Sequence, residues 1–369
     1  MCADGTDPTV SIRPLGHDEG PGRTAAPERE RLCHRGSQPG KAKSGARRGV
    51  PWAPMEIDGR TRHYGGFYGV EGGPVAAGST DLPVVLVWGN CQAEALRVVL
   101  NTVNTTPPRT LRVPPVHELT SDDLPHLARL LRRTRAVLSQ PVSRGYRGLP
   151  IGLDDLRDRL PADVPILRWP VVRWSALHPF QAIVRHPDDP SMDPPGVPYH
   201  DLRTIAAARD GRSADEPWDV DVPADAFREV ARRSADELRR REARDTDVAV
   251  SDILDDVGAE ATHTINHPQN AVLVRLGHRI LEALGWPGAV SDPGRTLLGG
   301  IRAPVEQRVL DALGLHGKTR SEWSVHLRTM TPDEIHRVQM RCYERYPGFV
   351  AAAQARHGEV MEILGLGPR

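Results

Sequence analysis

The feature that most constrains the fold is a short apolar run that turns abruptly into a helix. Residues 82–88 are apolar and rich in β-branched side chains, a pattern typical of a strand buried on both faces of a sheet. The run ends in a glycine-containing turn at residues 89–92, and residues 93–100 carry apolar side chains at helical spacing. A strand, a tight turn and a helix form the opening unit of an α/β sheet.

The same alternation continues along the chain. Patterning predicts helices over 124–133 and 151–160 and strands over 136–140 and 165–169. From residue 217 onward the strand signals fade, and further helices are predicted at 224–244, 270–284, 331–346 and 349–364. We therefore expect an α/β fold with a parallel sheet, flanking helices and a mainly helical C-terminal part.

Residues 1–75 differ in composition from the rest of the chain. They contain 14 glycines and 8 prolines without apolar periodicity, so they cannot bury enough surface to offset the entropy of ordering. We expect residues 1–75 to be a disordered N-terminal extension and residues 76–369 to form one domain. Met55 opens a more ordinary stretch, so residues 1–54 are either a genuine extension or an upstream translation artefact.

Composition excludes several classes of protein. Acidic and basic residues balance at 48 each, which argues against a protein that coats nucleic acid. No run of about 18 apolar residues exists, so no insertion into a membrane is expected. The first 30 residues lack the apolar core of a secretory signal, and the four cysteines form no CxxC pair. We expect a cytoplasmic protein, and the sequence carries no signal for an oligomeric state.

Cys91 occupies the position where an α/β sheet normally carries its chemistry. The turn between a strand and a helix lies at the carboxyl edge of the sheet, and the first free N–H groups of the helix point at it. The helix dipole favours a lowered thiol pKa, and the same N–H groups suit an oxyanion. Gly89 permits close approach of a substrate, while Asn90 and Gln92 add neutral donors. These residues suit acyl transfer through a thioester; the alternative is an inert cysteine buried under a helix.

A catalytic cysteine normally needs a base, and four histidines compete for that role. We rank His267 first and His200 second because each lies beside polar or turn-forming residues, ahead of His178 and His263. Sequence spacing does not show which ring faces Cys91, and a structural role stays open for each histidine.

No motif for a metal or a nucleotide accompanies these residues. His263 and His267 are four residues apart, but Asn266 and Pro268 disfavour a helix there, and no glutamate follows His263 as in metalloproteases. The glycine-rich loops of P-loop and dinucleotide-binding proteins are also missing from the sequence. We therefore expect no metal site.

The loop at residues 143–150 is a candidate for a phosphate-bearing ligand. It places Arg144, Tyr146 and Arg147 at the same edge as Cys91 if the sheet is parallel. Arginine suits phosphate, and tyrosine can stack on an aromatic base. The alternative is a solvated loop rich in turns.

Several short segments occur together in an order found in one enzyme family. They are Gly89-Asn90-Cys91-Gln92, Ser139-Gln140-Pro141 with the 146–150 loop, Tyr199-His200-Asp201-Leu202-Arg203, and Asn266-His267-Pro268. On these segments the chain resembles the WcbI family of capsular polysaccharide biosynthesis enzymes, over residues 83–364. The resemblance implies an enzyme that binds coenzyme A or acetyl-coenzyme A and acetylates a sugar hydroxyl of a surface polysaccharide or its precursor.

The first turn also resembles the first block of the SGNH hydrolases, with Cys91 where those enzymes have serine. Their Asp-x-x-His block is missing, because Thr264 stands three residues before His267. The residue that would orient the histidine is therefore left open, and the first βα unit is either SGNH-like or Rossmann-like.

Together these observations give the hypothesis of an acetyltransferase that uses acetyl-coenzyme A as co-substrate and a glycan or small molecule as acceptor. Cys91 attacks the thioester or lies beside its carbonyl, and His267 or His200 is the base. The predicted oxyanion donors are Asn90, Gln92 and Gln140, and the predicted coenzyme contacts are Gly89, Arg144, Tyr146 and Arg147. The alternatives are direct transfer without a covalent intermediate, an SGNH-like glycan deacetylase, and a non-catalytic component of a polysaccharide assembly complex.

Overall fold

The structure is a computed structural model that describes residues 58–70 and 82–368. The chain divides into two units, residues 1–55 and residues 56–369, and only the second contains described residues. The expected disorder of residues 1–54 and the choice of Met55 as a start therefore lie outside the described residues.

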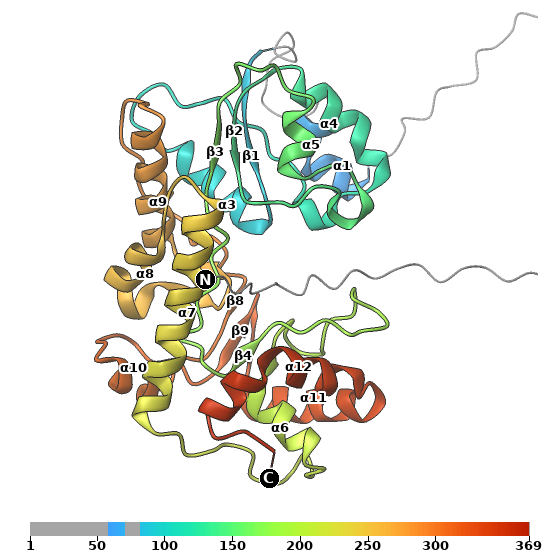
Figure 1. The fold of residues 1–369 in the computed structure, drawn as a ribbon, viewed down its shortest axis with the longest axis vertical. Coiled ribbons are helices and arrows are strands. Elements are labelled where there is room, and N and C mark those ends of the chain that lie inside the picture. The colour runs from blue at the N-terminus through green and yellow to red at the C-terminus, as the bar shows by residue number, and fades with distance from the viewer. Residues whose placement is uncertain (1–57, 71–81, 369) are drawn as a thin grey trace, which may run out of the picture. The chain divides into compact units, whose positions relative to one another are not determined.

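The described residues form an α/β region followed by a mainly helical region (Figure 1). The strands are β1 (Val84–Trp88), β2 (Thr134–Ser139), β3 (Ile166–Arg168), β4 (Gln181–Ala182), β5 (His200–Asp201), β6 (Thr262–Thr264), β7 (His267–Pro268), β8 (Ile301–Arg302), β9 (Trp323–Val325) and β10 (Arg328–Met330). The helices are α1 (Gly59–His63), α2 (Gly65–Tyr68), α3 (Cys91–Leu100), α4 (Leu124–Leu131), α5 (Leu153–Arg157), α6 (Leu202–Arg209), α7 (Ala224–Asp245), α8 (Ser251–Val257), α9 (Asn270–Ala283), α10 (Gln307–Leu313), α11 (Pro332–Arg345) and α12 (Gly348–Ile363).

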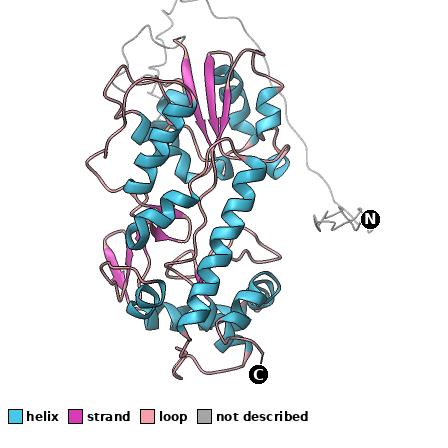
Figure 2. Ribbon diagram, turned by 60° about the vertical axis from the view of Figure 1, so that its left-hand side comes forward, coloured by secondary structure: helices cyan, strands magenta, loops and turns pink. Residues whose placement is uncertain are grey.

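A parallel three-stranded sheet, in the order β1-β2-β3, forms the centre of the α/β region, and its strands are drawn in magenta in Figure 2. At its carboxyl end Trp88 lies opposite Ser139, and Ser139 lies opposite Arg168. All five residues of β1 are buried, as expected for a strand covered on both faces. The predicted parallel sheet is confirmed, so the loops that follow β1, β2 and β3 meet at one edge.

Helices cover both faces of this sheet. Val85 and Val87 pack in a core cluster with residues of α3 and α9. Val84, Leu86 and Trp88 point the other way, into a cluster with α2, α4 and α5. This alternation follows from the period of two along a strand. Figure 1 shows α3 and α9 on one side of the sheet and α4 and α5 on the other.

Part of the predicted N-terminal extension is folded. α1 and α2 lie within residues 58–70, and Phe67 is 1% exposed in the cluster that covers the sheet. Arg60 forms an ion pair with Asp123 at 3.0 Å. The expectation of disorder up to residue 75 therefore does not hold for residues 58–70. The stretch is rich in glycine, but its few aromatic side chains bury enough apolar surface to hold it against the sheet.

The C-terminal region is mainly helical, as predicted, and also contains short antiparallel strands that sequence analysis missed. The strands pair as β4 with β5, as β6 with β7, and in the order β10-β9-β8. Each is two or three residues long, too short for an alternating pattern to be read from the sequence. The helices share a core cluster that includes Phe227, Tyr343 and Phe349.

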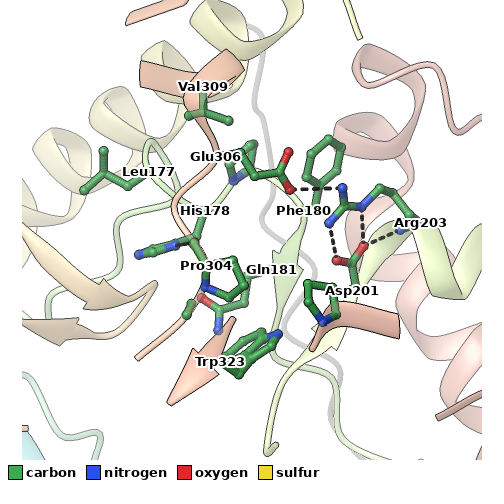
Figure 3. A pocket seen from close by; sticks show the side chains of 13 residues that line it. Leu177, His178, Phe180, Gln181, Asp201, Arg203, Pro304, Glu306, Val309 and Trp323 are labelled. Carbon is green, nitrogen blue, oxygen red and sulfur yellow. Dashed lines mark hydrogen bonds and ion pairs between the residues drawn. The ribbon is translucent and has the colours of Figure 1, made fainter. Parts of the chain in front are cut away.

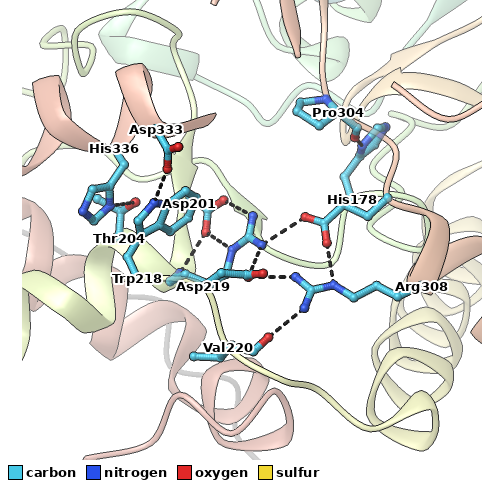
Figure 4. Close-up of polar contacts among 12 residues, drawn as sticks. His178, Asp201, Thr204, Trp218, Asp219, Val220, Pro304, Arg308, Asp333 and His336 are labelled. Atoms are coloured by element: carbon cyan, nitrogen blue, oxygen red, sulfur yellow. Dashed lines mark hydrogen bonds and ion pairs between the residues drawn. The ribbon is translucent and has the colours of Figure 1, made fainter. Parts of the chain in front are cut away.

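A buried arginine connects three parts of the C-terminal region. Arg203 in α6 donates to Asp201 at 2.7 Å, to Asp219 at 2.7 Å and to Glu306 at 3.0 Å. Arg308 in α10 donates to the same Asp219 and Glu306, at 2.8 and 2.6 Å (Figure 4). Because each guanidinium faces carboxylates, this network joins α6, the segment before α7 and α10.

Replacing Phe67 by alanine tests whether α2 belongs to the folded unit. Because the ring is buried, we expect Phe67→Ala to lower the free energy of unfolding by about 3 kcal/mol. Leu82→Ala is the control, since Leu82 is 50% exposed and should contribute less than about 0.5 kcal/mol. Urea denaturation of the full chain, followed by circular dichroism, measures both changes. Equally small effects would mean that α2 does not pack on the sheet.

Candidate functional site

The turn between β1 and α3 is shaped by three neighbouring side chains. Asn90 caps α3, because its Oδ1 accepts the N–H of Gln92 at 2.9 Å. Gly89 has a φ of +155°, and a Cβ there would lie 2.4 Å from Oε1 of Gln140. That Oε1 accepts the N–H of Asn90 at 2.9 Å. The close approach that requires glycine at position 89 is thus made by Gln140, which follows the neighbouring strand.

The buried side chain of Gln92 binds this turn to three other chain segments. Its Nε2 donates to the carbonyl of Val172 at 2.9 Å and to that of Asn266 at 2.8 Å. Its Oε1 accepts the N–H of Val172 and an N–H of Gln140 Nε2, both at 3.0 Å. Gln92 is fully buried, and its amide makes all four hydrogen bonds of which it is capable. These bonds join four chain segments.

The oxyanion donors predicted from the sequence are only partly available. The Gln92 amide has no donor left, and its backbone N–H is bound by Asn90, so the role predicted for Gln92 does not hold. Within residues 58–70 and 82–368, the Nδ2 of Asn90 has no hydrogen-bond partner and one N–H of Gln140 Nε2 stays open, while the N–H of Cys91 acts on its own thiol. These donors lie at the N-terminus of α3 or against it.

The fold brings Cys91 and His267 together. The Sγ of Cys91 lies 3.8 Å from Nε2 of His267, although the two residues are 176 positions apart in the sequence. His267 follows Asn266, whose backbone is bound to Gln92 and whose Oδ1 accepts the Tyr199 hydroxyl at 2.8 Å. The Nδ1 of His267 is buried and has no partner in the described part of the chain. In the described part of the chain, Cys91 and His267 therefore form a pair, without the third side chain that orients the histidine in a triad.

His200, the second predicted base, is held by other residues. Its Nδ1 lies 2.6 Å from the hydroxyl of Tyr343, and its ring packs against Phe349. No contact described for His200 involves Cys91. Of the two predicted bases, the geometry therefore favours His267.

Burial sets the protonation states of the Cys91–His267 pair. Desolvation raises the pKa of the Cys91 thiol to about 11, and the N–H groups of residues 91 and 92 oppose this only partly. Burial also lowers the pKa of His267 to about 4. Both groups are therefore neutral at pH 7 in the free protein. The lowered thiol pKa predicted from the helix dipole is wrong, because desolvation outweighs the dipole and the charge of Glu118 acts in the same direction as desolvation.

The predicted phosphate loop does not present its arginines as free charges. Arg144 pairs with Asp158 at 2.8 Å and with Asp155 at 3.4 Å. Arg147 donates to the backbone carbonyl of His117. Since Arg144 is neutralised by carboxylates of the same segment, the geometry does not favour its predicted role as a phosphate contact.

A different group of arginines lies close to the site. Arg173, Arg185, Arg241 and Arg356 are here called the arginine cluster. Desolvation lowers the pKa of Arg173, and the positive charges of Arg356, Arg241 and Arg185 lower it further. Arg173 directly follows Val172, whose backbone is bound to Gln92 and thus to the Cys91 turn.

Counter-charges are unevenly distributed in the arginine cluster. Arg185 pairs with Asp193 and Arg241 with Glu237, whereas Arg173 and Arg356 form no ion pair with any carboxylate of residues 58–70 or 82–368. Both unpaired side chains are exposed to solvent. Two arginines that lack acidic partners within a group of like charges are typical of a binding site for an anion.

A small pocket in the C-terminal region is a weaker candidate. It is lined by polar side chains that include His178, Gln181 and Arg203, with Trp323 as one wall (Figure 3). Neither Cys91 nor His267 borders it. His178 lies with its Nδ1 3.2 Å from the carbonyl of Pro304, which accounts for its position without a catalytic role.

The described residues also bear on metal binding and on membrane insertion. They contain no group of three or more His, Cys, Asp or Glu side chains placed to hold a metal ion. No helix among them has the length and apolar character needed to cross a bilayer.

Sequence reasoning missed residues that matter for this geometry. Arg173 follows β3 at the carboxyl edge, where the rule that identified Cys91 also applies, so it could have been found. Tyr199, which positions Asn266, was quoted only as part of a family segment and was given no role, and Arg356 in α12 gave no local signal. Their proximity to the site depends on how distant segments pack.

Comparisons with known proteins identify relatives in sequence and in fold. A family model described as polysaccharide biosynthesis enzyme WcbI matches residues 84–289, more than half of the chain. A solved structure of WcbI, described as a novel polysaccharide biosynthesis enzyme in its native form without a disulfide bond between coenzyme A and one of its cysteines, matches with a TM-score of 0.61 and 21% sequence identity. The match covers 77% of this chain and 99% of that one, and at this identity it shows the fold. No curated protein matches the chain.

The pH dependence of alkylation tests the protonation state of Cys91. Because its pKa is raised to about 11, the iodoacetamide rate at Cys91 should be low at pH 8 and should still be rising at pH 10, where an ordinary thiol with a pKa of about 8.5 has reached its plateau. A full chain with Cys2→Ser and Cys33→Ser leaves Cys342 as a second thiol, whose pKa burial also raises, so added N-acetylcysteine is the reference for an ordinary thiol. Peptide mass spectrometry measures both rates, and a plateau near pH 7 at Cys91 would contradict this prediction.

Proposed function

Because the chain belongs to the WcbI family of polysaccharide biosynthesis enzymes, we propose that it transfers an acetyl group from acetyl-coenzyme A to a sugar hydroxyl. The observation that carries this proposal is the 3.8 Å approach of Cys91 Sγ to His267 Nε2 at the carboxyl edge of the sheet. A thiol beside a neutral imidazole, at a helix N-terminus with free donors, suits acyl transfer. The description of the WcbI structure, which mentions coenzyme A and a cysteine, supports a coenzyme A thioester as the donor.

The two pKa shifts define how the proton has to move. A preformed thiolate–imidazolium pair is unfavourable, since the thiol pKa is about 11 and the imidazole pKa about 4. His267 therefore accepts the thiol proton while Cys91 attacks the acetyl carbonyl. The new C–S bond forms, the thioester C–S bond breaks, and the leaving coenzyme A thiolate takes the proton back from His267.

The second half of the reaction uses the same two residues. His267 accepts the proton of the sugar hydroxyl as its oxygen attacks the acetyl group on Cys91, and the Cys91 sulfur leaves and regains that proton. In both halves the carbonyl oxygen becomes an oxyanion, for which the N–H of Cys91, the Nδ2 of Asn90 and the open N–H of Gln140 are the proposed donors. The direct variant has the same base, without acetyl-Cys91.

The phosphates of the coenzyme are best matched by the arginine cluster. Arg173 and Arg356 form no ion pair with a described carboxylate, so both can bind a phosphate. Arg173 also directly follows Val172, whose backbone is hydrogen-bonded to Gln92. Tyr146 and Arg147 also remain candidate coenzyme contacts. Tyr146 acts electrostatically on Arg173, and Arg147 acts on His117, as does Arg185 of the arginine cluster. Arg144 is set aside because of its ion pairs.

Replacing the two central residues tests the reaction. We expect Cys91→Ala and His267→Ala each to reduce acetyl transfer at least about 100-fold while coenzyme A binding persists, because general base and nucleophile act only on the reacting carbonyl. Cys342→Ala and His200→Ala are the matched controls and should keep their activity. The assay follows coenzyme A thiol release and product formation, with mass spectrometry for an acetyl group on Cys91.

Three outcomes of that assay would change the proposal. Full transfer by Cys91→Ala, with loss in His267→Ala, would favour the direct route. Release of acetate from an acetylated sugar without coenzyme would indicate a glycan deacetylase. Unchanged behaviour of both variants would leave a non-catalytic component of an assembly complex as the better interpretation.

A titration tests the coenzyme contacts. Arg173→Gln and Arg356→Gln should each weaken coenzyme A binding by roughly ten-fold, the effect of one lost charge-assisted hydrogen bond. Arg144→Gln is the matched control and should bind with nearly unchanged affinity. Calorimetry at one fixed ionic strength measures all three, and a weakening confined to Arg144→Gln would move the phosphate site back to the 143–150 loop.

A further inference from the structure

A second group of basic side chains lies beside the proposed base. It consists of His263 in β6, Arg302 in β8 and Arg320, here called the His263 group. The N–H of Ala303 donates to the carbonyl of His263 at 2.8 Å, and the guanidinium of Arg320 donates to the carbonyl of Ala303 at 2.5 Å. His263 also lies within electrostatic reach of both arginines and of His267. The three residues thus form one local group next to the Cys91–His267 pair.

Polar atoms of the His263 group have no partner in the described part of the chain. His263 is only 4% exposed, and neither ring nitrogen makes a hydrogen bond, although the carbonyl of Leu297 faces the ring. The Nε of Arg302 is also buried without a partner. Neither Arg302 nor Arg320 forms an ion pair with a described carboxylate. Buried nitrogens of this kind are normally hydrogen-bonded, and an oxyanion is the acceptor that suits two guanidinium groups.

The surroundings of Arg302 fit a sugar as well as an anion. Its guanidinium lies along the backbone of Gly299, where a Cβ would come within 3.2 Å of Nη2. Arg302 pairs across the sheet with Ser324, and Ser324 pairs with Thr329, so these side chains share one face. The residues that alternate with Ser324, Trp323 and Val325, pack in a core cluster instead. The face with Arg302 therefore offers two hydroxyl groups beside a cation.

We propose that His263, Arg302 and Arg320 bind an anionic group carried by the acceptor sugar, a phosphate or a carboxylate. This inference rests on the proposed function, because it assigns the acceptor of the same reaction. Paired guanidinium groups bind either oxyanion through two parallel hydrogen bonds. An anion held there places the rest of the sugar towards His267, which has to accept the proton of its hydroxyl. The acceptor class is then a sugar phosphate, a nucleotide sugar or a uronic acid, rather than a neutral sugar.

Three probes that differ in one group test this inference on the full chain: glucose, glucose 1-phosphate and glucuronate. We expect at least one of the two anionic sugars to bind ten-fold or more tightly than glucose, and the one that does identifies phosphate or carboxylate. Arg302→Gln and Arg320→Gln should each weaken that binding by roughly ten-fold. Arg328→Gln, which changes an exposed arginine of the same small sheet, is the matched control. Arg302→Lys retains the charge and should recover part of the affinity if Arg302→Gln folds poorly.

A parallel titration with coenzyme A separates this inference from the proposed function. The coenzyme A affinity of Arg302→Gln and Arg320→Gln should equal that of the natural chain. A ten-fold loss of coenzyme A affinity in these variants would assign the His263 group to the coenzyme and overturn the inference, as would equal binding of the three probes. Failure of the natural chain to bind coenzyme A would overturn the proposed function instead, since the probe titrations need no coenzyme.

Discussion

The buried amide of Gln92 is the interaction on which the site depends. Its four hydrogen bonds join the turn after β1 to Gln140 after β2, to Val172 after β3 and to Asn266 before β7. A buried amide that loses one of these partners pays the full cost of desolvation, about 1–3 kcal/mol, so the loops are held in one arrangement. Cys91 and His267 meet because each is next to a residue of this network.

The same burial that makes the network strong determines the chemistry of the pair. Desolvation keeps Cys91 protonated and His267 unprotonated, so neither carries a charge that would be costly inside the protein. The thiol is thereby poorly reactive in the free protein and becomes a nucleophile only when its proton can pass to His267. A substrate carbonyl and a nearby oxyanion site are what make this transfer favourable.

The sequence predicted what local patterns determine. The β-branched run, the glycine turn and the helical spacing located β1, Cys91 and α3, and the parallel order of the strands followed from the alternation of elements. The choice between His267 and His200 could not be made, because it depends on a contact across 176 residues. The sign of the Cys91 pKa shift was missed for the same reason, since the desolvating atoms come from distant segments. The ion pairs of Arg144 could have been predicted from the sequence, because Asp155 and Asp158 lie in the next predicted helix.

The residues of the proposed chemistry lie together in one part of the chain, whereas those proposed for recognition are divided, since Arg173 and His263 lie inside the segment that matches the family. Cys91, Gln92 and His267 lie inside the segment that matches the family, residues 84–289. Arg302, Arg320 and Arg356 lie beyond it, in the region of short strands and C-terminal helices. If these arginines bind the acceptor and the coenzyme as proposed, family membership accounts for the reacting pair but does not specify the acceptor. The acceptor is then set by the charge and the hydroxyl groups that β8, β9 and β10 place beside a common catalytic pair.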